Sequence, residues 1–139
     1  MLRLKTLFLA LLIFLLQACS SKPGKYNMVG IWESDCVTTE TVGNYKVKSF
    51  YEPNGSFQAK MTFISTFFGI PASIDKKFYS GTYKNTKDKL EITITNVVGE
   101  SSLYDLPLID EYNLEWIDEN YVLISGNDKC TAIRSTNDL

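Results

Sequence analysis

Histidine is absent from this 139-residue sequence, which also has only three cysteines and four prolines. Without histidine, the chain lacks the usual general base of a nucleophilic triad and the commonest ligand of transition metals. Fourteen basic residues against sixteen acidic ones give a formal net charge of −2, so there is no basic surplus of the kind that nucleic-acid-binding proteins carry. These absences argue against the common hydrolytic enzymes, a transition-metal protein and a DNA or RNA partner.

Long hydrophobic runs are also scarce, and the one clear example lies at the N-terminus. Residues 1–5 carry two positive charges, and residues 7–16 (LFLALLIFLL) are all apolar. The uncharged segment 6–21 is shorter than the about 20 apolar residues that a membrane-spanning helix needs. This layout is typical of a signal peptide rather than of a transmembrane anchor.

The sequence Leu16-Gln17-Ala18-Cys19 follows this apolar run and resembles the bacterial lipobox. The resemblance implies that residues 1–18 are removed and that Cys19 receives a diacylglycerol, so acyl chains anchor the protein without a spanning helix. In Gram-negative lipoproteins a residue other than Asp after that cysteine, here Ser20, implies an outer-membrane location with the domain in the periplasm. The alternative interpretation is an ordinary secretory signal whose cysteine is incidental.

The chain after the signal peptide predicts one small domain. Removing residues 1–18 leaves twelve basic and sixteen acidic side chains, a formal charge of −4. Residues 20–27 are polar and turn-rich, so we expect residues 19–28 to form the lipidated end and a tether. Residues 29–135 are expected to form the domain, and residues 136–139 a C-terminal tail.

Hydrophobic alternation with a period of two predicts an all-β domain. Residues 56–65 show it best, because Phe57, Ala59, Met61 and Phe63 alternate with polar side chains, and no segment keeps a helical period. Turn signals separate about eight short antiparallel strands in meander order: 30–36, 44–52, 56–65, 78–84, 90–95, 111–118, 121–125 and 129–134. Such strands form either a sandwich or an up-and-down barrel, and closure as a barrel removes exposed edges.

Cys36 and Cys130 lie in the first and last expected strands. Once Cys19 is lipidated, they are an even pair in an exported chain, so we expect a disulfide. If they lie directly opposite each other in an antiparallel pair, the residue numbers of all partners sum to 166, which also sets Trp32 opposite Arg134 on the same face. That pairing favours a closed barrel and a cation–π contact. Two free thiols or a diagonal bridge are the alternatives.

Gly30-Ile31-Trp32 in the first strand, with Arg134 in the last, resembles the signature of the lipocalins. The resemblance implies that Trp32 plugs one end of the barrel, that Arg134 packs across it, and that these residues and Gly30 are structural. The mid-chain Thr-Asp-Tyr motif and the C-terminal helix of full-length lipocalins are missing. We therefore expect a lipocalin-like bacterial lipoprotein rather than a true lipocalin.

Catalytic and metal-binding motifs are not found in the sequence. There is no glycine-rich phosphate loop, no nucleophile in a recognisable setting and no loop with the regular Asp and Asn spacing of a calcium site. Neighbouring carboxylates beside turns are interpreted as solvated surface; the pairs are Glu33 and Asp35, Asp110 and Glu111, and Asp118 and Glu119. We expect no enzymatic activity, no metal and no cofactor.

The segment Phe67-Phe68-Gly69-Ile70-Pro71 departs from strand alternation and places bulky apolar side chains in a connection. One interpretation is a bent strand or short helix that caps the open end of the barrel and completes the core. The other makes Phe67, Phe68 and Ile70 the lip of a portal for an apolar ligand, or a contact patch for a partner.

Two functions remain at this point. The lipocalin resemblance implies a binding module for a small apolar or lipid ligand; the alternative is a periplasmic interaction protein that acts as an inhibitor, immunity factor or assembly accessory. A cavity with convergent tyrosine hydroxyls would favour the binding module, and a solid core would favour the interaction protein. The expected ligand-binding residues are Tyr45, Met61, Phe63, Phe67, Phe68, Tyr83, Ile92, Leu114 and Trp116.

Overall fold

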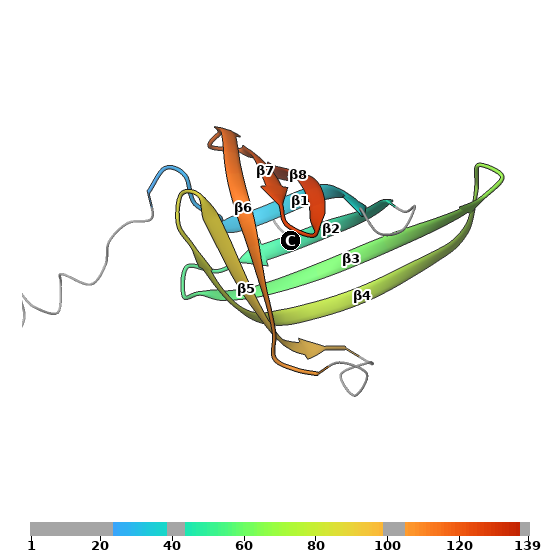
Figure 1. Ribbon diagram of the computed structural model, residues 1–139, viewed down its shortest axis with the longest axis horizontal. Coiled ribbons are helices and arrows are strands. Elements are labelled where there is room, and N and C mark those ends of the chain that lie inside the picture. The colour runs from blue at the N-terminus through green and yellow to red at the C-terminus, as the bar shows by residue number, and fades with distance from the viewer. Residues whose placement is uncertain (1–23, 39–43, 99–104, 137–139) are drawn as a thin grey trace, which may run out of the picture.

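The computed structural model of the protein describes residues 24–38, 44–98 and 105–136. Eight strands form one closed barrel (Figure 1). The expected signal peptide, the expected lipid attachment at Cys19 and residues 137–139 lie outside the described residues. The strands are β1 (Gly30–Thr38), β2 (Asn44–Tyr51), β3 (Ser56–Phe67), β4 (Ile70–Asn85), β5 (Lys89–Val97), β6 (Leu108–Asp118), β7 (Tyr121–Ser125) and β8 (Asp128–Arg134).

The strands follow one another around the barrel in chain order, and every neighbouring pair is antiparallel. This confirms the expected up-and-down barrel and excludes the sandwich. Tight turns connect most strands because the sequence places turn-forming residues there; Gly55, for example, has a φ of 89° in the turn between β2 and β3. No helix that could cross a bilayer occurs among the described residues.

The seam between β1 and β8 closes the barrel with the register expected from the sequence. Cys36 lies opposite Cys130, and Trp32 lies opposite Arg134. Cys36 and Cys130 form a disulfide with a Cα–Cα distance of 4.1 Å, which joins positions 94 residues apart. The free thiols and the diagonal bridge are therefore excluded. A crosslink between such distant positions stabilises a fold by about 2–5 kcal/mol, mainly by restricting the unfolded chain.

Alternation places one side of every strand inside the barrel. In β1 the buried residues are Trp32, Ser34 and Cys36, separated by exposed residues. The alternating residues expected in β3, from Phe57 to Phe63, lie opposite the inward-facing residues of β2 from Tyr51 to Tyr45. At Gly81 the β4–β5 register shifts, and a Cβ there would come within 1.9 Å of the Thr93 carbonyl oxygen. Only glycine allows the two backbones to approach this closely.

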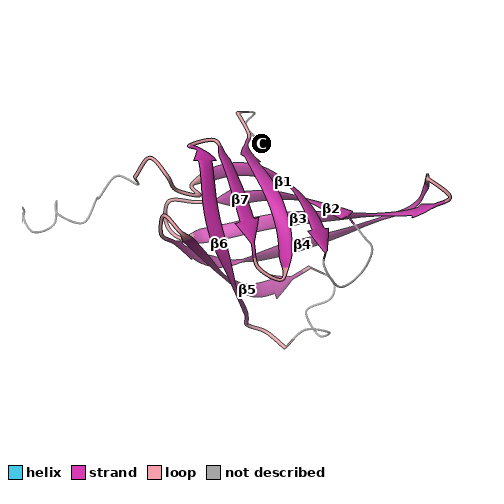
Figure 2. Ribbon diagram, turned by 45° about the horizontal axis from the view of Figure 1, so that its top comes forward, coloured by secondary structure: helices cyan, strands magenta, loops and turns pink. Residues whose placement is uncertain are grey.

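The apolar segment 67–71 does not form the expected cap. β3 and β4 continue past the barrel as a two-stranded hairpin whose turn is Phe68-Gly69, and both turn residues have positive φ values, 50° and 78°. Figure 2 shows this hairpin extending away from the other strands. Because a two-residue hairpin loop of this kind keeps the twist of its strands, the ladder continues straight outward instead of bending over the barrel.

The packed domain starts earlier than residue 29. Met28, which we placed in the tether, is fully buried in the core cluster with Trp32 and Val122. In Figure 1 the N-terminal segment reaches the barrel at the end opposite the projecting hairpin. Met28 closes the barrel at that end because its long apolar side chain fills the space beside the Trp32 indole.

Candidate ligand-binding cavity

One end of the barrel is closed by Trp32 and Arg134. The Arg134 guanidinium carbon lies 4.5 Å from the centroid of the Trp32 ring, a cation–π contact. Its Nη1 donates a hydrogen bond to the Val29 carbonyl, and Nη2 donates to the carbonyls of Asn27 at 2.9 Å and Glu119 at 3.2 Å. Burial lowers the pKa of Arg134 from its ordinary value. The expected structural roles of Trp32 and Arg134 agree with these contacts.

A glycine is needed at position 30, at the same end of the barrel, because of its backbone conformation and its closeness to Arg134. Its φ is 117°, a conformation that residues with a Cβ rarely adopt, and a Cβ at this position would lie 3.1 Å from Nη1 of Arg134. The glycine thus leaves room for the guanidinium beside the start of β1.

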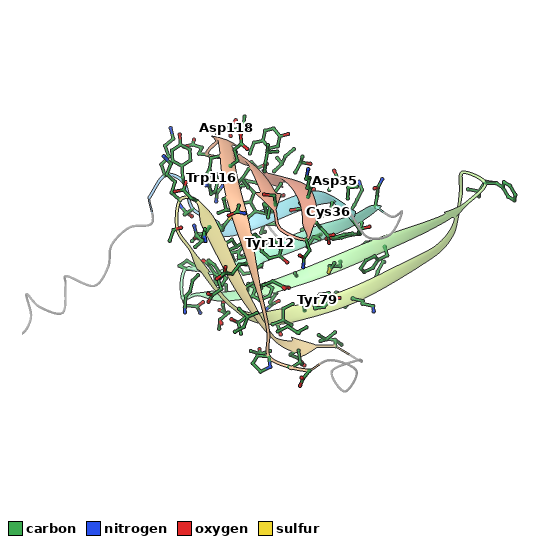
Figure 3. All side chains as sticks on the ribbon, viewed as in Figure 1. Asp35, Cys36, Tyr79, Tyr112, Trp116 and Asp118 are labelled. Atoms are coloured by element: carbon green, nitrogen blue, oxygen red, sulfur yellow. A yellow bond between two sulfur atoms is a disulfide. The ribbon has the colours of Figure 1, made fainter. Side chains whose placement is uncertain are left out.

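Further aromatic rings extend the closed end outward. The Trp116 ring packs edge-on against Trp32 with centroids 5.8 Å apart, and Tyr26 packs on its other side at 5.7 Å. The Trp116 indole donates a hydrogen bond of 2.7 Å to the Lys87 carbonyl. Trp116 was expected to bind ligand, but these contacts place it in the closed end, and Figure 3 shows it far from Cys36 and Tyr79.

The other half of the barrel contains a cavity of about 110 Å³. Apolar side chains, tyrosine rings and the disulfide form its wall. Its lining residues are Ser34, Cys36, Tyr45, Val47, Ser49, Tyr51, Phe57, Ala59, Met61, Tyr79, Leu90, Ile92, Ile94, Tyr112, Ile124 and Cys130. A closed barrel of eight strands is just wide enough to hold one small ligand when its inward side chains do not fill it.

A tyrosine and an aspartate meet at the open end of the cavity. The Tyr45 hydroxyl donates a hydrogen bond of 2.5 Å to Oδ2 of Asp128, which joins β2 to β8. Burial raises the pKa of Tyr45 far above its ordinary value, and the hydrogen bond and the charge of Asp128 raise it further. The phenol is therefore neutral over the physiological pH range and remains a donor to the carboxylate.

Two more tyrosines in the wall have raised pKa values for the same main reason. Burial raises the pKa of Tyr51 to about 12, and the neighbouring Tyr83 adds to this. The pKa of Tyr112 is raised first by burial and then by the charge of Asp110. The cavity thus offers neutral phenols as hydrogen-bonding groups in a wall whose other residues are apolar, apart from Ser34 and Ser49.

The residues expected to bind ligand divide between the two ends. Tyr45, Met61 and Ile92 line the cavity. Phe63 stacks beside Tyr45 with ring centroids 5.4 Å apart, at the open end. Leu114 belongs to the core cluster instead of the wall.

Tyr83 also lies away from the cavity. Its hydroxyl donates a hydrogen bond of 2.7 Å to the Glu52 carbonyl, and its ring packs edge-on against Tyr51. Tyr83, Leu114 and Trp116 were expected at the cavity but lie away from it for one reason. A hydrophobic pattern shows which side chains point inward but not at which height along the barrel axis they lie.

Tyr79 and Tyr112 line the cavity but were not expected there (Figure 3). Tyr79 lies four residues from Tyr83 and Tyr112 lies two residues from Leu114, so each shares the inward-facing side of a residue that was selected. Alternation alone therefore made them candidates. Only the strand registers reveal that they, rather than Tyr83 and Leu114, lie at the height of the cavity.

The projecting hairpin presents apolar side chains to solvent. Phe68 at the turn is 90% exposed, and Ile70 is 71% exposed. The Phe67 side chain lies outside what the structure describes. Phe63 is the last β3 residue opposite β2, so the turn lies five residues, roughly 17 Å, beyond the open end. Phe68 and Ile70 therefore do not line the cavity in this conformation.

The carboxylate pairs have different surroundings. Glu33 and Asp35 point outward, as expected, and form exposed ion pairs with Lys48 and Lys46 at 4.0 and 3.5 Å. Asp110 does not belong to the solvated surface: it is half-buried, and its charge raises the pKa of Tyr112. Within the described ranges, no group of three or more cysteine, aspartate or glutamate side chains is arranged to hold a metal ion.

Comparisons with known proteins give no family for this chain. No protein-family model matches the sequence, and no curated protein is significantly similar to it. The function is therefore argued from the barrel and its cavity.

Proposed function

We propose that this protein is a non-catalytic binding module that holds a small apolar ligand inside its barrel. The observation that carries the proposal is the cavity of about 110 Å³, which combines an apolar wall with phenol groups. A concave apolar site with a few placed polar groups is the usual form of a small-molecule binding site. The aromatic plug at one end leaves the other end as the route of entry.

The size of the cavity limits the ligand. An apolar cavity of about 150 Å³ can hold a benzene molecule, whereas drug-sized ligands occupy about 300–1,000 Å³. A compact apolar group, such as a short alkyl chain or the end of a longer acyl chain, fits the space. The rest of a larger ligand would extend past Tyr45 and Phe63 into the region beside the projecting hairpin.

The test is native mass spectrometry of the chain from Ser20 onward, which keeps all described residues and the disulfide. The protein is purified from a bacterial periplasm and measured before and after incubation with a lipid extract. We expect an additional mass of a small apolar molecule that is lost when the protein is unfolded. A clean apo mass in both samples would refute the binding module.

The proposal includes attachment to the outer membrane through acyl chains on Cys19, with the barrel in the periplasm. It is supported by the charged N-terminus, the apolar run and the Leu-Gln-Ala-Cys sequence. Metabolic labelling with a fatty-acid analogue, compared between the wild-type protein and Cys19→Ser, tests the attachment. Labelling that survives this substitution would exclude Cys19 as the site.

The hairpin tip supports a second candidate function, contact with another envelope protein. Phe68 is an exposed aromatic residue in a positive-φ conformation that favours Gly, Asn or Asp. An exposed aromatic side chain at a backbone position that costs conformational energy is a common feature of functional sites.

A photo-crosslinking amino acid at position 68, compared with the same amino acid at position 133, tests this second candidate. Ile133 is also exposed but lies on the barrel wall. We expect discrete crosslinked species from position 68 alone in intact cells. Equal crosslinking at both positions would indicate non-specific encounter.

A further inference from the structure

Two carboxylates whose side chains the structure describes lie on the inward-facing side of the barrel at its open end. Asp110 is two residues from Tyr112 in β6, and Asp128 is two residues from Cys130 in β8, so each shares the inward side of a residue that lines the cavity. Both precede those residues in strands that run toward the closed end. Both side chains are half-buried.

The phenols connect these carboxylates to the cavity. Asp128 accepts the hydrogen bond from Tyr45, and Asp110 lies two residues from Tyr112 on the same side of β6, where its charge acts on the Tyr112 phenol. The charge of Asp128 acts on both tyrosines, since it contributes to the raised pKa of each. The carboxylates and phenols thus form one group of interacting side chains around the open end of the cavity, which we call the mouth.

Positive charge on the inward side is scarce at this end. Among the described strands, the basic residues at inward-facing register positions are Arg134, which is engaged with Trp32 at the closed end, and Lys77 in β4, opposite Met61. Lys77 has interactions of its own. It can neutralise one carboxylate at most, so the mouth keeps a negative charge.

We propose that the barrel selects ligands with a cationic head, holding the apolar group in the cavity and an ammonium group at the mouth near Asp110 and Asp128. This inference rests on the proposed function and specifies the class of ligand. An ammonium group gains charge-assisted hydrogen bonds from the carboxylates and cation–π contacts from the tyrosine rings. A carboxylate head in the same place meets like charge.

Three probes of equal chain length distinguish the contribution of the headgroup to binding from that of the apolar chain: hexylammonium, hexanol and hexanoate. Their affinities are measured by isothermal titration calorimetry on the chain from Ser20 onward, at pH 7 and low salt. We expect hexylammonium to bind about tenfold more tightly than hexanol, the difference between a charged and a neutral hydrogen bond, and hexanoate to bind most weakly.

The outcomes distinguish this inference from the function on which it rests. If hexanol or hexanoate binds as tightly as hexylammonium, the cavity binds ligands and the cationic preference is wrong. If none of the three binds, the binding module itself is refuted, and the headgroup preference with it.

Asp110→Asn and Asp128→Asn remove one charge each and keep the shape and a hydrogen-bond acceptor. We expect each to weaken hexylammonium binding about five- to tenfold and hexanol binding by much less, because a neutral hydroxyl gains less from a charged acceptor. Asp35→Asn is the matched control, because it makes the same charge change on the exposed outer face of β1. Equal loss of hexanol binding in the Asp128 variant, or equal weakening of hexylammonium by the Asp35 variant, would contradict a direct role at the mouth.

Discussion

The two ends of the barrel are built differently from the same alternating strands. At the closed end Met28, Trp32 and Val122 are completely buried, and Arg134 satisfies three backbone carbonyls while it covers the indole. At the open end the inward side chains are tyrosines and aspartates around a cavity, and one hairpin continues into solvent. Tight packing and free space are thus separated along the barrel axis.

This difference shows where stability and binding reside. Close-packed interiors lose stability when atoms are removed or added, whereas a cavity tolerates added atoms. A barrel that is fixed at one end can therefore leave the other end unfilled for a ligand. Substitutions at the closed end should change stability, and substitutions at the open end should change binding.

The largest effect is expected from Arg134→Ala. The substitution removes the cation–π contact and leaves the carbonyls of Asn27, Val29 and Glu119 without their donor, so we expect the free energy of unfolding to fall by about 2–4 kcal/mol. Urea unfolding measures it. Lys129→Ala, an exposed position in the same strand, is the control and should change stability by less than about 0.5 kcal/mol. Similar losses in both variants would argue against a special role of the closed end.

A pair of identical substitutions compares the two halves directly. Ala132 is fully buried and Ala59 lines the cavity. We expect Ala132→Leu to destabilise the fold by about 1–3 kcal/mol through overpacking, and Ala59→Leu to cost less than about 1 kcal/mol because the added atoms enter free space. Ala59→Leu should also abolish hexanol binding in calorimetry. Equal destabilisation by the two would mean that the cavity does not accept additional atoms.

The stability of the protein at alkaline pH tests whether the Tyr51 phenol is buried. The folded-state pKa of Tyr51 is about 12, above the ordinary value of about 10, so only the unfolded chain ionises this residue between those pH values. Stability is unaffected below pH 10, and it falls by about 1.4 kcal/mol per pH unit for this residue between pH 10 and 12. Urea unfolding at pH 9, 10 and 11 should show a shallower decline for Tyr51→Phe than for the wild-type protein. Parallel declines would contradict the assignment.

The smallest expected effect is a gain at the hairpin tip. Phe68 has a φ of 50° and almost no cover, whereas Asn is favoured at this turn position. We expect Phe68→Asn to raise the free energy of unfolding by about 0.5–1 kcal/mol. Thermal unfolding checks it, and calorimetry with hexanol should be unchanged. A loss of stability would show that the Phe68 ring makes contacts that the fold needs.

Much of the barrel could be predicted because its causes are local. Alternation determined the strands and their inward sides, and the spacing of Cys36, Cys130, Trp32 and Arg134 determined the closing register. The projecting hairpin was not predicted, because positive φ values at Phe68 and Gly69 allow a tight turn that an apolar sequence does not reveal. The cavity was predicted only in part: Tyr45, Met61 and Ile92 line it, but Tyr83, Leu114 and Trp116 do not.

The sequence by itself determined an all-β chain, its strand count, the disulfide and the Trp32–Arg134 pair of the closed end. Each of these depends on a repeat of two residues or on the spacing of a few side chains. The tertiary structure alone decided the height of each inward side chain along the barrel axis. Height depends on the cumulative shift in register across all eight strands, and on bulges such as the one at Gly81, so it brings Tyr79 and Tyr112 to the cavity and Trp116 to the closed end.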